Sequence, residues 1–325
     1  MKKILLSILF FKLLILTLHA QKRSPEEIRD FFWGANDLYQ SAIEIPEKWS
    51  NESAVILYQE FNYHYRNTRR GLDFTESFRR RIKLQDKSSV EEYSEFSVSE
   101  KYKIKKGFSK KGGRSFAGFK VIKPDGKEVA IDMSDAVEVK NEGGEIFKKI
   151  AIPDLQPGDI IDYYFYLYEP FIAMGTHVFD PVISQLSGLY PIVKQKMEFN
   201  TGKSFYVNFK SINGAPALKK VSDDDKKVLV YQLEDENREK SELLRWFYPR
   251  RVIPTIKFQV SLARKEVDKP KLQAFFGDKG SIKNGVTKND LLAYYDQRFK
   301  FKKKKKTSAG GGQRLGSVAI KVILN

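Results

Sequence analysis

The chain of 325 residues contains no cysteine. This absence excludes disulfides, zinc–thiolate sites, thiol redox chemistry and a cysteine nucleophile. Histidine is scarce as well. Beyond the first twenty residues only His64 and His177 remain, and neither stands in a spacing typical of metal ligands. We therefore expect no catalytic residues, no metal site and no cofactor.

The formal net charge of +17 is concentrated at the two ends of the chain. Residues 1–20 carry three lysines and residues 300–325 carry eight bases, and neither stretch contains an acid. The remainder has 47 bases against 41 acids. Its internal basic clusters, Arg69-Arg70 and Arg79-Arg80-Arg81, are short and fall on alternating strand faces, so the body of the chain has no continuous basic stripe. We expect no nucleic-acid partner.

The amino terminus has the pattern of a secretory signal peptide. Lys2 and Lys3 precede an almost entirely apolar run from Ile4 to Leu18, and Ala20 ends it with a small residue. Lys12 divides the run into pieces too short to span a membrane. We expect cleavage after Ala20, a periplasmic or secreted product, and no stable membrane span afterwards.

Alternating hydrophobicity dominates the mature chain and predicts strands. The turn sequences Lys123-Pro124-Asp125-Gly126 and Gln156-Pro157-Gly158-Asp159 separate some of them. The fold class that we expect is mainly β, an antiparallel β-sandwich with a short N-terminal helix and a C-terminal helical segment. The strand residues expected to share buried faces are Leu57, Phe61, Tyr63, Tyr65, Phe74, Phe78, Ile82, Leu84, Ile161, Tyr163, Phe165, Leu167, Met197, Phe199, Phe205, Val207, Phe209, Leu229, Tyr231, Leu233, Phe258, Val260 and Leu262.

The N-terminal helix is expected to begin after Ser24 and to run to about Ser41, and the C-terminal helix to begin at Asn289. The domain boundaries follow these changes in pattern. Residues 1–20 are the signal peptide, 21–46 an N-terminal helical segment, 47–265 the β-sandwich module with one or two sheet pairs, 266–301 the helical start of a truncated following domain, and 302–325 a basic, glycine-rich disordered tail.

The tail has a second interpretation. Lys302 to Lys306 form an unbroken lysine run, and the sequence after it is unlike what precedes it. A slip of reading frame at A-rich lysine codons would produce such a change, so the native continuation can be a different sequence. Resequencing the gene across this point distinguishes the two.

Three segments together resemble a known family: the first strand after residues 45–54, residues 116–131 (FAGFKVIKPDGKEVAI) and residues 152–170 (IPDLQPGDIIDYYFYLYEP). The pattern, over about residues 45–260, resembles the uncharacterised amino-terminal β-rich domain that precedes transglutaminase-like, papain-type cysteine cores in exported bacterial proteins. The resemblance implies an extracytoplasmic module whose partner is a downstream transglutaminase-like domain. The catalytic cysteine of such a core has no counterpart in this chain.

Aromatic and cationic side chains supply the one candidate binding site. Rings stack on sugars, and guanidinium groups bind carboxylates or phosphates. We assign a possible contact patch for a cell-envelope polymer to Arg245, Trp246, Tyr248, Arg250 and Arg251.

Two weaker signals carry structural interpretations instead. Ser115 lies in a sequence that approaches a nucleophile elbow but lacks its last glycine. The acidic clusters Asp223–Asp225 and Glu234–Glu236 lack the spacing of a calcium loop and are expected to be solvated turns.

Three functions follow in order. The first is a non-catalytic extracytoplasmic β-sandwich module that acts in positioning or recognition. The alternatives are a module that binds a polysaccharide or cell-envelope polymer, and a hydrolase that uses paired carboxylates.

Overall fold

The structure is a computed structural model, and it describes residues 23–35, 37, 39, 43–68, 71–99, 113–144, 146–172, 176–222, 228–241, 251–263, 279–284, 287–293 and 295–296. The expected signal peptide (1–20) and the lysine run and tail (302–325) lie outside these residues. Within the described residues no helix has the length and apolar character needed to cross a membrane.

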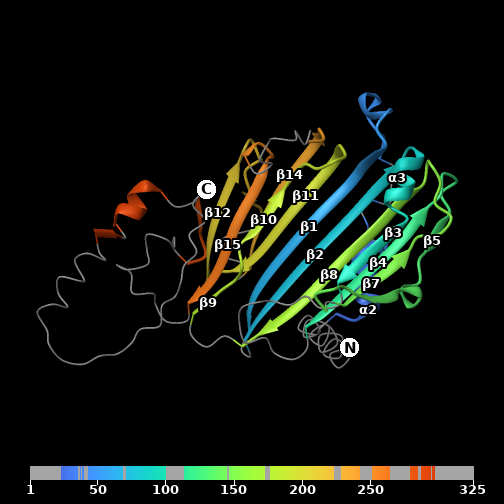
Figure 1. Ribbon diagram of the computed structural model, residues 1–325. Helices are drawn as coiled ribbons and strands as arrows, with labels where there is room; N and C mark the ends of the chain where they lie inside the picture. Colours follow the sequence, from blue (N-terminus) through green and yellow to red (C-terminus); the bar gives the residue numbers. More distant parts are fainter. Residues whose placement is uncertain are drawn as a thin grey trace, which may run out of the picture.

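An eight-stranded central sheet organises the molecule (Figure 1). Its strands, in spatial order, are β13 (Lys219–Lys220), β14 (Val228–Arg238), β11 (Ile192–Gly202), β1 (Ala54–Thr68), β2 (Gly71–Leu84), β8 (Ile160–Phe171), β4 (Arg114–Ile122) and β5 (Glu128–Ala130). All neighbours pair antiparallel except β1 and β11, which are parallel. The mainly β prediction is confirmed, whereas no sequence pattern indicated the parallel pair.

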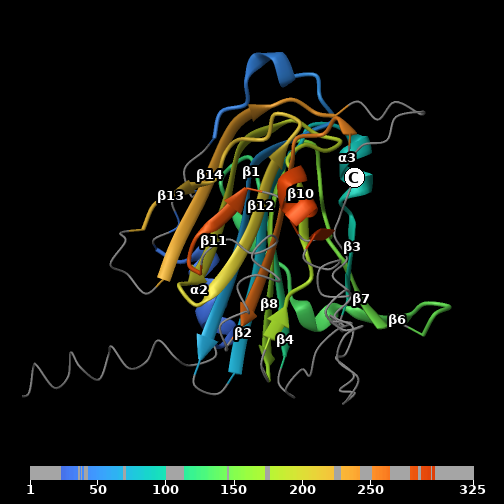
Figure 2. The same cartoon turned by 90° about the vertical axis from the view of Figure 1, so that its left-hand side faces the viewer.

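Two smaller sheets cover the central sheet at opposite ends (Figure 1). The five-stranded cover contains β10 (Val182–Gln185), β15 (Thr255–Ala263), β12 (Phe205–Ile212) and β16 (Ile282–Asn284), with β9 (Thr176–Val178) also paired to β15. The three-stranded cover contains β3 (Glu95–Ser99), β7 (Ile146–Ala151) and β6 (Val137–Lys140). Short helical turns add α3 (Lys87–Glu92), η2 (Glu47–Trp49) and η3 (Met133–Asp135). Figure 2, seen from the side of the five-stranded cover, shows β12 in front of the central strands.

Both covers pack on the same face of the central sheet, called here the inner face. On β2, Leu72 and Phe74 join the hydrophobic cluster under the five-stranded cover, and Ile82 and Leu84 join the cluster under the three-stranded cover. Side chains two apart on a strand point to one face, so these four residues share it. The inner-face strand residues predicted from alternation are in these two clusters or pack against them, apart from Leu57, which is buried on the opposite face.

The two turns that carry the family resemblance contact each other. Gly126 closes the β4–β5 hairpin with φ +85°, and Gly158 adopts φ +99° in the turn before β8. Lys123 Nζ donates to Asp159 Oδ2 at 2.7 Å and to the Asp154 carbonyl at 2.7 Å. Asp159 is buried and also accepts from the Gln156 amide at 2.8 Å. The two motifs therefore form one connected corner.

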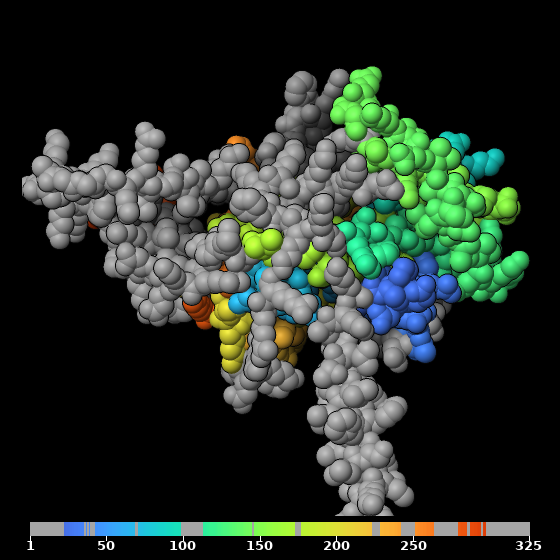
Figure 3. Space-filling model, turned by 90° about the horizontal axis from the view of Figure 1, so that it is seen from below, coloured from blue at the N-terminus to red at the C-terminus, as the bar shows by residue number. Residues whose placement is uncertain are grey.

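Helix α2 (Pro25–Trp33) covers part of the opposite, outer face. Ser24 and Glu27 cap its start reciprocally, as the sequence predicts. Ile28 and Phe32 pack on Tyr164 and Tyr166 of β8, and Figure 3 shows this amino-terminal segment in blue against the green strands.

The predicted helix end near Ser41 is wrong. The helix ends at Trp33, because Gly34 turns to an extended conformation while its amide still donates to the Asp30 carbonyl at 2.9 Å. A Cβ atom on residue 34 would lie 2.3 Å from that carbonyl oxygen, which only glycine avoids.

A buried ion cluster attaches the segment after α2 to the sheet. Arg79 on β2 donates two hydrogen bonds to Asp162 of β8, at 3.0 and 2.8 Å, and two to Asp37, both at 2.8 Å. It also donates to the Phe32 carbonyl at 2.6 Å. Arg81 Nε lies 3.3 Å from Asp162 but in a geometry that makes no hydrogen bond, so its contribution is charge alone. The sequence analysis had placed Arg79 and Arg81 on a polar face. In the structure this face is buried.

The region expected to start a following domain differs from that expectation. Within 266–301 the structure describes β16, which pairs in parallel with β12 and so belongs to the five-stranded cover. Residues 288–293 are helical, as expected, but Thr287 caps them rather than Asn289, through reciprocal hydrogen bonds with Asp290 at 2.8 and 3.2 Å. Thr287 and Asp290 have the capping-box spacing, which explains the earlier start.

Candidate binding pocket

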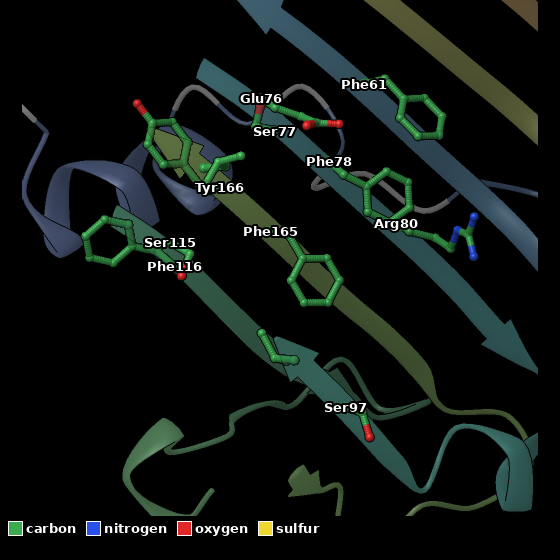
Figure 4. A pocket seen from close by; sticks show the side chains of 12 residues that line it. Phe61, Glu76, Ser77, Phe78, Arg80, Ser97, Ser115, Phe116, Phe165 and Tyr166 are labelled. Atoms are coloured by element: carbon green, nitrogen blue, oxygen red, sulfur yellow. The ribbon is translucent and has the colours of Figure 1, made fainter. Parts of the chain in front are cut away.

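A pocket of about 380 Å³ opens on the inner face of the central sheet, between the two covers (Figure 4). It lies where the two hydrophobic clusters meet. Phe61 packs against the cluster under the five-stranded cover, and Phe78 and Phe165 pack against the other cluster. The lining residues come from β1, β2, β3, β4 and β8 and are Phe61, Glu76, Ser77, Phe78, Arg80, Ser97, Val98, Ser115, Phe116, Phe165, Tyr166 and Leu167.

Three aromatic rings from neighbouring strands form the floor of the pocket (Figure 4). Phe61 of β1 pairs with Phe78 of β2, and Phe78 pairs with Phe165 of β8. The ring centroids are 4.9 Å apart in the first pair and 6.4 Å in the second, whose planes are nearly parallel. All three side chains are only partly buried, so the floor presents an apolar surface to whatever enters.

A buried polar network holds one end of the floor. Arg80 Nη2 donates to Gln59 Oε1 at 2.9 Å, and Gln59 Nε2 donates to Gln195 Oε1 at 2.8 Å. Gln195 donates in turn to Asp235 Oδ2 at 2.7 Å, and Asp235 pairs with Arg238. The network crosses β2, β1, β11 and β14. It fixes Arg80 beside Phe78, with its guanidinium carbon 5.0 Å from the ring centroid.

Two glutamates lie at the other end. Glu76 lines the pocket from β2, and Glu169 of β8 lies diagonally across from it, because Glu76 pairs with Leu167 and Phe74 pairs with Glu169. Burial raises the pKa of Glu76, and the hydrogen bond from Tyr63 partly opposes this. Burial and the neighbouring Glu76 raise the pKa of Glu169 to about 7. Within the described residues Glu169 Oε2 is buried without a hydrogen-bond partner.

This arrangement suits binding better than nucleophilic chemistry. Ser115 lies in a regular antiparallel part of β4, opposite Leu167, rather than on the sharp strand-to-helix turn of a nucleophile elbow. His64 and His177 do not line the pocket, and burial lowers the pKa of each imidazole. The described residues contain no group of three side chains able to hold a metal ion.

The predicted contact patch falls almost entirely outside the described residues. These omit Arg245, Trp246, Tyr248 and Arg250, and include only Arg251, which is exposed just before β15. Of the acidic clusters, Asp223–Asp225 also lies outside. The second cluster is on strand β14, where Asp235 joins the polar network and Glu236 lies 3.3 Å from Lys194. The expectation of a solvated turn there is wrong.

The pocket residues were missed although the sequence carried a signal for them. Phe74, Phe78, Ile82 and Leu84 were expected to share one face of a strand. The same period of two places Glu76 and Arg80 on that face. Charged side chains within a buried alternating run are the signal that could have identified the pocket.

The fold and pocket define a β-rich, two-cover module. The family profile described as a domain of unknown function with a solved structure, DUF3857, matches residues 73–238, just over half of the chain. The chain therefore belongs to the DUF3857 family, and the matched range contains every residue that lines the pocket except Phe61.

A solved structure shows the same fold. The crystal structure of a protein described as a "putative protease" from Parabacteroides distasonis matches with a TM-score of 0.50 and 13% identity. The match covers 64% of this chain and 40% of that protein. At this identity the similarity concerns the fold alone. No curated protein matches the chain.

Proposed function

We propose that this chain is a non-catalytic, extracytoplasmic recognition module that acts ahead of a transglutaminase-like domain and holds a ligand segment in the inner-face pocket. The observation that carries the proposal is an apolar pocket with an aromatic floor on a rigid sheet. Strands hold side chains in fixed positions, so the site is preorganised and little conformational entropy is lost on binding.

Two further findings support a module within a larger protein. The structurally similar protein is longer than the matched region, since the match spans 40% of it. The sequence segments that resemble the domain ahead of transglutaminase-like cores form the Lys123–Asp159 corner beside β8, the strand that supplies Phe165 to the pocket.

Binding of an uncharged apolar fluorophore, N-phenyl-1-naphthylamine, tests the pocket. We expect saturable binding to the mature protein and its loss in Ser115→Trp, because an indole at this exposed rim position fills the pocket. Ser134→Trp, at an exposed position in η3, is the matched control and retains binding. Equal binding by both variants would contradict a recognition role for the pocket.

A transamidation assay tests the non-catalytic part. Incubation of the mature protein with a glutamine-containing peptide and a primary amine is expected to release no ammonia above the buffer rate. Reproducible turnover that disappears in Ser115→Trp would contradict the proposal and assign catalysis to the pocket.

The carboxylate pair also favours testing the hydrolase alternative. Glu169, with its pKa near 7, has the protonation behaviour of a general acid, and Glu76 is a second carboxylate on the adjacent strand. A panel of nitrophenyl glycosides is the direct assay. Activity abolished by both Glu76→Gln and Glu169→Gln would support hydrolysis, and no activity in the wild-type protein would reject it for these substrates.

A further inference from the structure

The acidic end of the pocket has the chemistry of a cation site. Glu76 and Glu169 are on adjacent strands of one sheet face, and Glu169 is only 6% exposed. Two like charges at such a position repel each other, and burying a carboxylate without a partner costs free energy. In the part of the chain that the structure describes, no ion pair reaches either glutamate. A cation from outside would satisfy both.

The nearest cationic side chain among the pocket residues is already engaged. Arg80 is four residues along β2 from Glu76, a separation of about 13 Å at strand spacing. Its guanidinium donates to Gln59 at the opposite end of the aromatic floor. Arg66, the other nearby arginine, pairs with Asp73, which alternation places on the outer face. The acid end is thus separated from both bases.

One wall of the pocket is a strand edge. Strand β3 contributes Ser97 and Val98 to the lining and pairs with β7 on one side. On its other side no strand pairs with it among the described residues. Alternate amide and carbonyl groups of an edge strand point away from its partner and can receive another extended chain. Figure 4 shows Ser97 on β3 facing the same hollow as Phe78 and Phe165.

From this geometry we propose that the pocket binds an extended peptide that adds to the free edge of β3 and places one lysine side chain over Phe78 and Phe165, with its ammonium at Glu76 and Glu169. Main-chain hydrogen bonds to β3 hold the peptide, and the pocket selects the side chain. The aliphatic stem of lysine matches the apolar floor, and its ammonium offers three donors to the two carboxylates. This proposal rests on the proposed recognition function.

The test compares two short peptides of alternating threonine and alanine that differ at one central residue, lysine or the uncharged norleucine. Each carries a fluorescein label, and anisotropy is measured with the mature protein at pH 8, where Glu169 is mainly ionised. We expect the lysine peptide to bind at least about tenfold more tightly, which corresponds to roughly 1.4 kcal/mol.

The double variant Glu76→Gln and Glu169→Gln is expected to lose this preference while still binding N-phenyl-1-naphthylamine. A lysine peptide with N-methylated backbone amides is expected to bind more weakly, because it cannot complete the ladder on β3. Lys83→Gln and Glu142→Gln, which change charges outside the pocket, are the control variants and keep the preference.

Each outcome separates the two proposals. Equal binding of the lysine and norleucine peptides, or a lysine preference retained in the double variant, would overturn the cation site and leave the recognition pocket in place. Equal binding of the methylated peptide would overturn addition to β3. Failure of every peptide and of the apolar fluorophore to bind would overturn both proposals, with far-ultraviolet circular dichroism confirming that each variant is folded.

Discussion

Arg79 and Glu169 show what burial on a strand face does to charged side chains. Arg79 is buried on the outer face between two carboxylates, each of which accepts two hydrogen bonds from it. Glu169 is buried on the inner face beside another acid. The first charge is compensated and supports the fold, whereas the second is uncompensated among the described residues and is suited to a ligand.

Replacing Arg79 tests the compensated charge. Arg79→Met leaves Asp162 and Asp37 buried without their partner, and breaking such a pair costs about 3–5 kcal/mol. We expect the free energy of unfolding, measured by urea denaturation at neutral pH, to fall by that amount. Arg114→Met, at an exposed position on β4, is the control and should change it by less than about 0.5 kcal/mol. Similar losses in both variants would show that the cluster has no special role.

The pH dependence of the same cluster follows from Asp37. Burial alone would raise the pKa of Asp37, but its hydrogen bonds with Arg79 hold the pKa below the ordinary value. The folded protein therefore keeps this carboxylate ionised at a pH where the unfolded chain binds a proton. Its contribution is present above the ordinary pKa and is lost as the pH falls through the lowered one.

Glu169 gives the opposite pH dependence. Its pKa rises from an ordinary value of 4.5 to about 7 on folding, so between these values the folded protein binds more protons than the unfolded chain. The free energy of unfolding should fall as the pH rises through this window, by about 2–3 kcal/mol. Glu169→Gln removes the effect and should be more stable than wild type at pH 8 but not below pH 4.5.

Urea denaturation from pH 4 to pH 8 measures this difference, and Glu142→Gln, an exposed position in the β6–β7 turn, is the matched control. If the stability of Glu169→Gln and wild type changed in parallel over the whole range, the burial of Glu169 would not be responsible for the effect.

At the scale of elements, the two turns are stabilised by one lysine. Lys123 precedes the hairpin turn and reaches Asp159, the last residue of the turn before β8. The connection fixes β4 and β8, which pair along Arg114–Ile122 and so position two walls of the pocket.

Asp159→Asn tests this connection. The variant loses the charge that holds Lys123, and hydrogen bonds to charged groups contribute about 1.5–3 kcal/mol. We expect a decrease of about 1–3 kcal/mol in the free energy of unfolding by urea denaturation. Asp125→Asn, in the adjacent hairpin turn, removes the same charge at an exposed position and should be nearly neutral. Equal effects would show that the corner is not held by this ion pair.

Local patterns were sufficient to predict most of the strands and their inner faces. The alternation in β1, β2, β8, β11, β12, β14 and β15 and the Pro-Asp-Gly hairpin depend on near neighbours in sequence. Pairing partners depend on residues far apart. The parallel contact of β1 with β11 joins residues such as Ile56 and Ile192, and no local signal specifies it.

The site was less accessible for the same reason. The pocket combines β2 and β8 with β3 and β4, and its position depends on the gap between two covers. The buried state of Arg79 was also hidden, because its partners Asp37 and Asp162 lie 42 and 83 residues away. Glu76 and Arg80 could have been identified, since they alternate with Phe78.

At the scale of the whole molecule, export remains a prediction with a direct test. We expect expression in a bacterium with a secretory pathway to yield a mature protein that begins at Gln21, as measured by intact mass and amino-terminal sequencing. Ala20→Arg should block this cleavage, because the position before the cleavage site requires a small residue. A cytoplasmic product that retains Met1 and the apolar segment would contradict export.

The lengths of the outermost strands of the central sheet have a consequence for self-association. In the described part of the chain that sheet ends at β13, a lysine dipeptide, and at β5, three exposed residues. Neither offers a backbone ladder long enough to template another copy, and the two lysines repel an identical edge. Each molecule can therefore be concentrated at a crowded cell surface without its largest sheet nucleating fibres.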